Sequence, residues 1–127
     1  MNNNELNERL KQINIEDYIW IVYLGIILLS WYGNSFERKY YINKDQTSKT
    51  KYQNITILIF SILIIVYFYF LKSSISDIKN IKPYYSQKKK DLIYLSFIGS
   101  LLVTLSGVIF LFIAITDNNL DVEIAFN

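Results

Sequence analysis

Hydrophobic positions fall into three long blocks along the chain, and the charged positions lie between them. The blocks cover residues 18–33, 52–71 and 92–116. The third block is the longest of the three, and it holds no charged residue, no proline and no amide side chain. As a helix it would reach ~37 Å, which exceeds the ~30 Å hydrocarbon core of a bilayer. We therefore predict a membrane-spanning helix there.

The first two blocks predict two further spans. Residues 18–33 carry Tyr18 and Trp20 near one end and Trp31 and Tyr32 near the other, which is typical of a helix with aromatic rings at both membrane interfaces. This block is only ~21 Å long between its outer tyrosines, so two alternatives stay open: a buried helix that does not span, and a cleavable signal sequence. The acidic leader and the lack of a small-residue cleavage motif argue against the signal sequence. As a helix the second block would reach ~30 Å, which matches the hydrocarbon core. Ordinary strands have about four to eight residues, and this block is far longer.

The leader, residues 1–17, is predicted to form a short amphipathic helix over about residues 5–15. Leu6, Leu10 and Ile13 recur at spacings of four and three, which places them on one helical face. The alternative is a frayed polar segment that happens to contain three apolar residues.

Polar connectors occupy residues 34–51 and 72–91, and an acidic tail covers residues 117–127. The second connector has isoleucine at every third position, which favours one or two helical turns against the membrane surface, ended by Pro83. The tail alternates apolar and polar residues, which fits an edge strand, a segment that docks on a partner, or a disordered tail. The whole chain predicts one all-α membrane domain, a three-helix transmembrane bundle with a short N-terminal amphipathic helix.

Composition excludes several function classes. The chain has no cysteine and no histidine, which removes thiol chemistry, disulfides and the commonest metal ligands. A net charge of +2 without long runs of like charge argues against nucleic-acid binding. No Asp, Glu, Lys, Arg or His lies inside a block, which argues against a self-contained ion-coupled transporter. We expect no enzyme activity, no metal and no cofactor.

The basic residues predict a topology. Three spans place the leader and the second connector on one side, with eight Lys and Arg residues, against five on the other side. The positive-inside rule then predicts a multi-pass protein of the cell membrane, with a cytoplasmic N-terminus and an external C-terminus. Lys88, Lys89 and Lys90 stand directly before the third block. We expect them to bind anionic lipid headgroups, in preference to pairing with the acidic leader.

Small residues recur at spacings of three and four in the third block, and they form one narrow stripe on a helix. They are Ser96, Gly99, Ser100, Thr104 and Gly107. Small residues let two helices approach closely in lipid, so we expect this stripe to pack against another helix. The alternative is a polar stripe that lines a pore or a solute path.

Three short motifs accompany this layout: DYIW at 17–20, YFYF at 67–70 and DVEI at 121–124. Together with it they resemble the small three-span membrane proteins of AT-rich Gram-positive bacteria, which carry no assigned activity. From the residues we expect a small non-enzymatic integral membrane protein that acts through helix–helix association, such as a regulatory or immunity-like accessory subunit. Its partners would be the lipid bilayer and another membrane protein or a second copy of itself. The alternatives are a holin-like pore former and a small oligomeric transporter.

Overall fold

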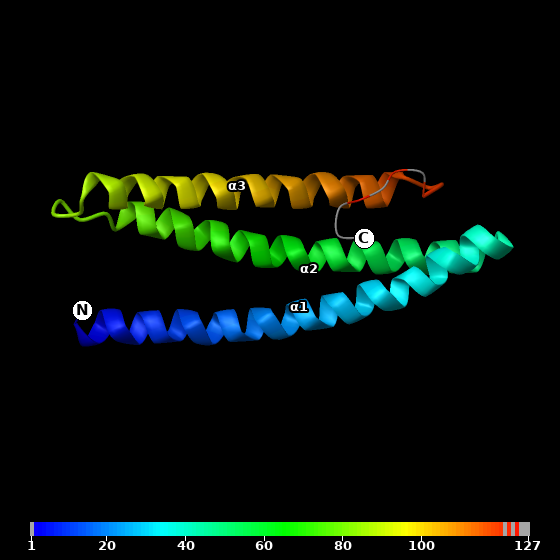
Figure 1. Ribbon diagram of the computed structural model, residues 1–127, viewed down its shortest axis with the longest axis horizontal. Helices are drawn as coiled ribbons and strands as arrows, with labels where there is room; N and C mark the ends of the chain where they lie inside the picture. Colours follow the sequence, from blue (N-terminus) through cyan, green and yellow to red (C-terminus); the bar gives the residue numbers. More distant parts are fainter. Residues whose placement is uncertain (1, 121, 123, 125–127) are drawn as a thin grey trace.

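The computed structural model describes residues 2–120, 122 and 124. It consists of three helices, α1 Asn3–Asn43, α2 Gln46–Lys79 and α3 Gln87–Thr116, and the described residues contain no strand (Figure 1). Each helix is long and apolar enough to cross a membrane. The predicted all-helical chain with three candidate spans is confirmed at this level.

The leader is helical, as its apolar spacing predicts, but it is not a separate short helix. α1 runs without a break from Asn3 to Asn43. Its first turn is capped by Asn2, whose side-chain oxygen accepts a hydrogen bond of 2.8 Å from the Glu5 amide. No helix breaker follows residue 17, and Glu, Gln, Lys and Arg extend a helix nearly as well as leucine. A change from polar to apolar residues therefore does not end the helix.

Most of the first connector belongs to α1 and α2, and only a short turn at Lys44 and Asp45 separates the two helices. Lys44 adopts a left-handed conformation, with φ of 54°, and its amide donates to the Tyr40 carbonyl at 2.8 Å. Asp45 then caps α2, because its carboxylate accepts from the Thr47 amide at 3.1 Å and from the Ser48 hydroxyl at 2.7 Å. The Ser48 hydroxyl bond is the main reason why the pKa of Asp45 is lowered.

The second connector is also shorter than predicted, because α2 continues to Lys79. The turns that carry Ile75 and Ile78 are the last turns of α2, so they are not a separate segment at the membrane surface. The helix ends before Pro83, as predicted. α3 then begins after Ser86, whose hydroxyl accepts from the Lys89 amide at 3.2 Å.

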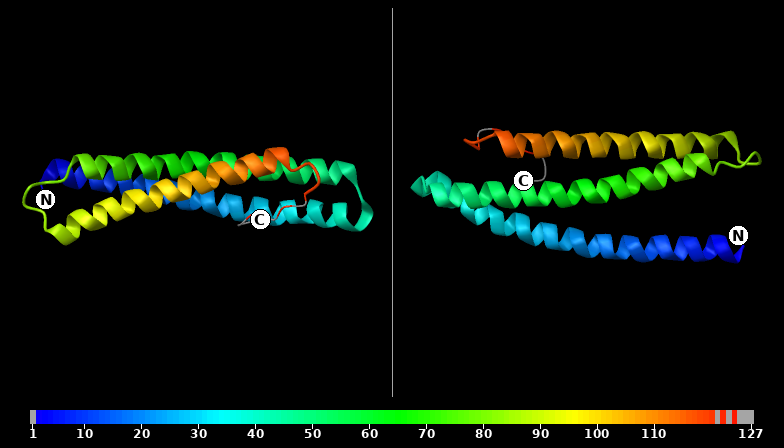
Figure 2. Two further views of the ribbon diagram at one scale, coloured as in Figure 1. Left: turned by 90° about the horizontal axis from the view of Figure 1, so that it is seen from above. Right: turned by 180° about the vertical axis from the view of Figure 1, so that it is seen from behind.

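α2 is the central helix of the molecule. α1 and α3 pack on it from opposite sides, and the described parts of these two helices do not contact each other (Figures 1 and 2). Phe60 of α2 is 2% exposed and lies 5.7 Å from the ring of Phe110, centroid to centroid. The start of α1 lies at the same end as the α2–α3 loop, and the α1–α2 turn extends past the end of α3 (Figure 1).

The apolar blocks end level with one another at the α1–α2 turn. A Cβ built on Gly33 of α1 would lie 3.2 Å from Cγ2 of Ile55 in α2. The amide of Gln53 donates to the Ala114 carbonyl of α3 at 3.1 Å. The first, second and third blocks therefore all stop at about the level of Gln53.

The apolar blocks are staggered at the opposite end. Thr104 of α3 lies beside Tyr67 of α2, since its hydroxyl is 3.5 Å from the Tyr67 carbonyl oxygen. The two helices run antiparallel, so residue 100 of α3 is level with Leu71, the last apolar residue of the second block. Residues 92–99 consequently extend past the apolar parts of the other two helices by roughly 12 Å.

Candidate functional site

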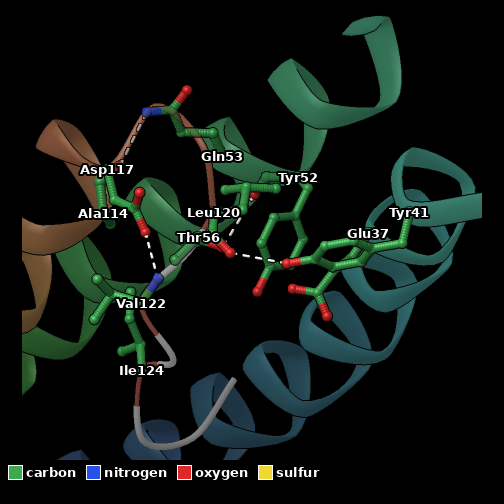
Figure 3. Close-up of a pocket in the computed structure, with 10 residues that line it drawn as sticks. All are labelled: Glu37, Tyr41, Tyr52, Gln53, Thr56, Ala114, Asp117, Leu120, Val122 and Ile124. Atoms are coloured by element: carbon green, nitrogen blue, oxygen red, sulfur yellow. Dashed lines mark hydrogen bonds between the residues drawn. The ribbon is translucent and has the colours of Figure 1, made fainter. Parts of the chain in front are cut away.

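A polar pocket of about 280 Å³ lies near the α1–α2 turn, where the tail folds back over the helices (Figure 3). All three helices and the tail contribute to its walls. The lining residues are Glu37, Tyr41, Tyr52, Gln53, Thr56, Ala114, Asp117, Leu120, Val122 and Ile124.

The described part of the tail docks on its own chain. The Tyr41 hydroxyl of α1 donates to the Leu120 carbonyl at 2.8 Å (Figure 3). The Asp117 carboxylate accepts from the Val122 amide at 2.8 Å, which closes a tight turn after α3. Ile124 is 8% exposed and belongs to the hydrophobic core. Residues 118–120, 122 and 124 form no strand, and the other alternating positions, 121, 123 and 125–127, lie outside the described residues.

The polar side chains in the pocket wall interact with other groups of the same chain. Gln53 donates to the carbonyls of Ala114 and Ile115, at 3.1 and 3.5 Å, and so satisfies acceptors in the last turn of α3. The Tyr52 hydroxyl lies next to the Glu37 carboxylate (Figure 3). These contacts tie the ends of the helices and the tail together, so the geometry of the pocket supports a structural role.

The pocket offers little reactive chemistry. Its described walls hold hydroxyls, one amide and two carboxylates, and the whole sequence lacks thiols and imidazoles. Across residues 2–120, 122 and 124, no group of three or more Asp and Glu residues is placed to hold a metal ion. The Asp117 carboxylate is already used to hold the turn of the tail.

The predicted small-residue stripe divides into two parts. Thr104 and Gly107 are buried against α2, and a Cβ on Gly107 would lie 3.0 Å from Cδ2 of Tyr67. The Thr104 hydroxyl donates to the Ser100 carbonyl at 2.7 Å, as hydroxyls in apolar helices commonly do. This half of the stripe packs within the chain, against α2.

The other half of the stripe is left uncovered. Ser96 and Gly99 are exposed and Ser100 is half-buried. A Cβ on Gly99 would meet no atom within 4 Å. These residues line an open groove of about 330 Å³ together with Tyr23, Tyr67, Phe70 and Val103. We refer to it below as the α3 groove.

The predicted headgroup residues, Lys88, Lys89 and Lys90, form the first turn of α3. The ammonium of Lys89 lies 3.7 Å from the ring centroid of Tyr85, which is cation–π geometry. At the same end of the molecule, Glu8 of the leader and Lys72 of α2 line one open cavity of about 310 Å³. The structure thus brings the leader to the end of α2, and the three lysines stand on the other side of α2.

The polar pocket was not found from sequence. Its parts are spread from Glu37 to Ile124, and no single stretch contains them. A usable signal is the spacing of Glu37 with Tyr41 and of Tyr52 with Thr56, because polar pairs four apart share a helical face at the edge of an apolar block.

Comparison of the chain with protein-family models, with curated proteins and with solved structures found no match.

Proposed function

We propose that this chain is a small non-enzymatic protein of the cell membrane that acts by binding a helix of another membrane protein in the α3 groove. The observation that carries the proposal is that half of the small-residue stripe stays uncovered. Gly107 packs under a ring of its own chain, whereas Gly99 meets no atom within 4 Å. A regulatory or immunity-like accessory subunit is the class of role that fits.

The positions of the charged residues indicate where the hydrocarbon core lies on the molecule. Placing its edge at Leu92 would draw eight charged residues of α1 and α2, between Glu8 and Asp17 and between Lys72 and Lys79, into hydrocarbon. Each costs ~2.5–3.5 kcal/mol at the centre of a bilayer, and less near its edge. Leaving five large apolar residues of 92–99 outside forfeits only roughly 2–3 kcal/mol in total. The edge therefore lies near Tyr18 and Leu71.

With this placement the α3 groove lies at the edge of the hydrocarbon. The Val103 end of the groove lies inside this edge and the Ser96 end outside it. Lipid tails are as apolar as a leucine side chain, so inside the edge helices associate through close packing and hydrogen bonds. Gly99 permits close approach of a second backbone, and the hydroxyls of Ser96 and Ser100 lie along the same groove. A helix carrying small residues of its own would fit this surface best.

The proposed orientation keeps the N-terminus and the α2–α3 loop in the cytoplasm. The excess of Lys and Arg at that end supports it. The polar pocket and the tail would then face the outside.

The test compares leucine substitutions at two glycines. Gly99→Leu fills the groove and should abolish recovery of the partner, while the variant folds normally because the site is open. Gly25→Leu is the matched control, since a Cβ at Gly25 also meets no atom within 4 Å and Gly25 lies outside the groove. Membranes are solubilised with a mild detergent, and membrane proteins that copurify are identified by mass spectrometry. Equal recovery of the same proteins with the Gly99→Leu variant and the original chain would contradict the proposal.

A further inference from the structure

The leader carries an apolar face that its own chain does not cover. Leu6, Leu10 and Ile13 are 45%, 49% and 43% exposed. The opposite face of the same turns, with Gln12 and Ile15 on it, lines the cavity shared with α2. The leader continues α1 past Tyr18. With the hydrocarbon edge proposed above, on which this inference rests, its apolar face lies outside the hydrocarbon.

α3 has a second uncovered apolar face at the same end. Leu95 and Ile98 are 60% and 48% exposed. They lie on the side of α3 opposite Ser100 and Thr104, since each residue turns the helix by 100°. They belong to the part of α3 that extends past Leu71, so with the same proposed edge they also lie outside the hydrocarbon.

The two faces stand at a similar depth. The cavity at this end places Gln12 and Ile15 of α1 beside Ser73 of α2. The Thr104–Tyr67 contact places Ile98 of α3 level with that same serine. Ile13 therefore lies within about one helical turn of the depth of Ile98, and Leu10 within about one turn of the depth of Leu95.

Charge differs in sign between the two faces. Residues 2–17 carry four acids and two bases, and residues 87–91 carry three bases and one acid. Glu5 lies in the first turn of α1, and Lys88 and Lys89 lie in the first turn of α3, at the same end of the molecule (Figure 1). Within one copy these charges cannot meet, because α1 and α3 lie on opposite sides of α2 (Figure 1).

We propose that the occupant of both faces is a second copy of this chain. The Leu6–Leu10–Ile13 face of one copy packs on the Leu95–Ile98 face of the next, with the acidic first turns of α1 beside the basic first turn of α3. Copies in one membrane share the same depth and sidedness, and α1 and α3 both begin at this end. The two helices can therefore meet parallel and at a similar depth. Because two different faces meet, the contact is head-to-tail and builds a ring or a row of copies.

This contact does not depend on the α3 groove. It uses the outward sides of α1 and α3, and the Gly99→Leu variant should assemble as the original chain does. Failure of groove binding and failure of self-assembly therefore give different results.

The absence of cysteine in the chain permits a direct test. Two single-cysteine variants, Ile13→Cys and Ile98→Cys, carry tags of different size and are reconstituted together in vesicles of zwitterionic lipid. Mild oxidation should then give a mixed disulfide dimer. Gln12→Cys paired with Ile98→Cys is the matched control, because position 12 is at the same depth and faces α2. Equal yields from both pairs, or dimers of Ile13→Cys with itself alone, would overturn the proposal.

Charge reversal provides a second measurement. The variant Glu5→Lys should reduce the mixed dimer several-fold, and adding Lys88→Glu and Lys89→Glu should restore it. Helical content by circular dichroism checks that each variant is folded. If the three lysines serve only anionic lipid, the reversal leaves the dimer yield unchanged and the lysine variants lose binding to phosphatidylserine vesicles, which overturns the charge pairing.

Discussion

Gly107 of α3 lies under the ring of Tyr67 in α2, where a built Cβ would come within 3.0 Å of Cδ2 and 3.1 Å of Cε2. Ile64 lies nearly as close, at 3.3 Å. Only hydrogen fits at this position without movement of a neighbour. The contact sets how closely α2 and α3 approach each other.

Gly107→Leu should therefore destabilise the molecule. An added side chain in a filled contact costs ~1–3 kcal/mol, because the ring of Tyr67 or the helix itself has to move. Gly99→Leu is the matched control on the same helix: the added side chain meets no neighbour, so stability should not fall and should rise by up to ~1 kcal/mol through helix propensity. Unfolding in mixed micelles, followed by circular dichroism, measures both. Equal losses for the two variants would show that the α2–α3 contact is misplaced.

A second prediction concerns Gln53, which donates from α2 to the Ala114 and Ile115 carbonyls of α3. Gln53→Glu keeps the size of the side chain but removes the donor at neutral pH and turns a carboxylate toward carbonyl oxygens. We expect a loss of about 1–3 kcal/mol in the same unfolding measurement. Gln46→Glu makes the same chemical change in the first turn of α2, where a negative charge is favourable. If both variants lose stability equally, the bond from Gln53 does not hold the end of α3.

A third prediction concerns pH and Asp45, the exposed N-cap of α2. Its pKa is lowered chiefly by the Ser48 hydroxyl bond. Because the folded-state pKa lies below that of the unfolded chain, about 3.9, the ionised carboxylate stabilises the folded state above this value. The contribution is lost as the pH falls through the folded-state pKa. Asp45→Asn still caps the helix but does not titrate, so the original chain should melt higher at pH 7, and the difference should shrink toward pH 3. A difference that is constant over this range would contradict the assignment.

The helices were predictable because three long apolar blocks need helices to satisfy their backbone groups. Their ends were not predictable from the same pattern. Residues 3–17 and 34–43 are polar yet continue α1, since polar helix formers such as Glu and Lys extend a helix once it has begun. The real stop between α1 and α2 is set by Lys44 and Asp45, a left-handed residue followed by an N-cap.

The small-residue stripe shows a different limit of prediction from sequence. Its periodicity identifies one face of α3, but it does not show which part of that face α2 covers. α3 crosses α2 obliquely (Figure 2), so Thr104 and Gly107 are covered while Ser96 and Gly99 are not. The crossing angle depends on packing between segments far apart in sequence, such as Phe60 with Phe110.

The turn between α1 and α2 gives the last prediction. Lys44 holds φ at 54°, a conformation that costs a residue with a Cβ roughly 1–2 kcal/mol and costs glycine almost nothing. Lys44→Gly should raise stability by about 0.5–1 kcal/mol, because the relief exceeds the loss of a weak contact between the Lys44 ammonium and the Tyr40 ring, 6.0 Å from its centroid. Lys49→Gly is the matched control, since Lys49 also lies over the Tyr40 ring but sits within α2. There glycine should cost about 1 kcal/mol. Opposite signs for the two variants locate the left-handed residue at position 44, and a loss at both would show that α1 does not end there.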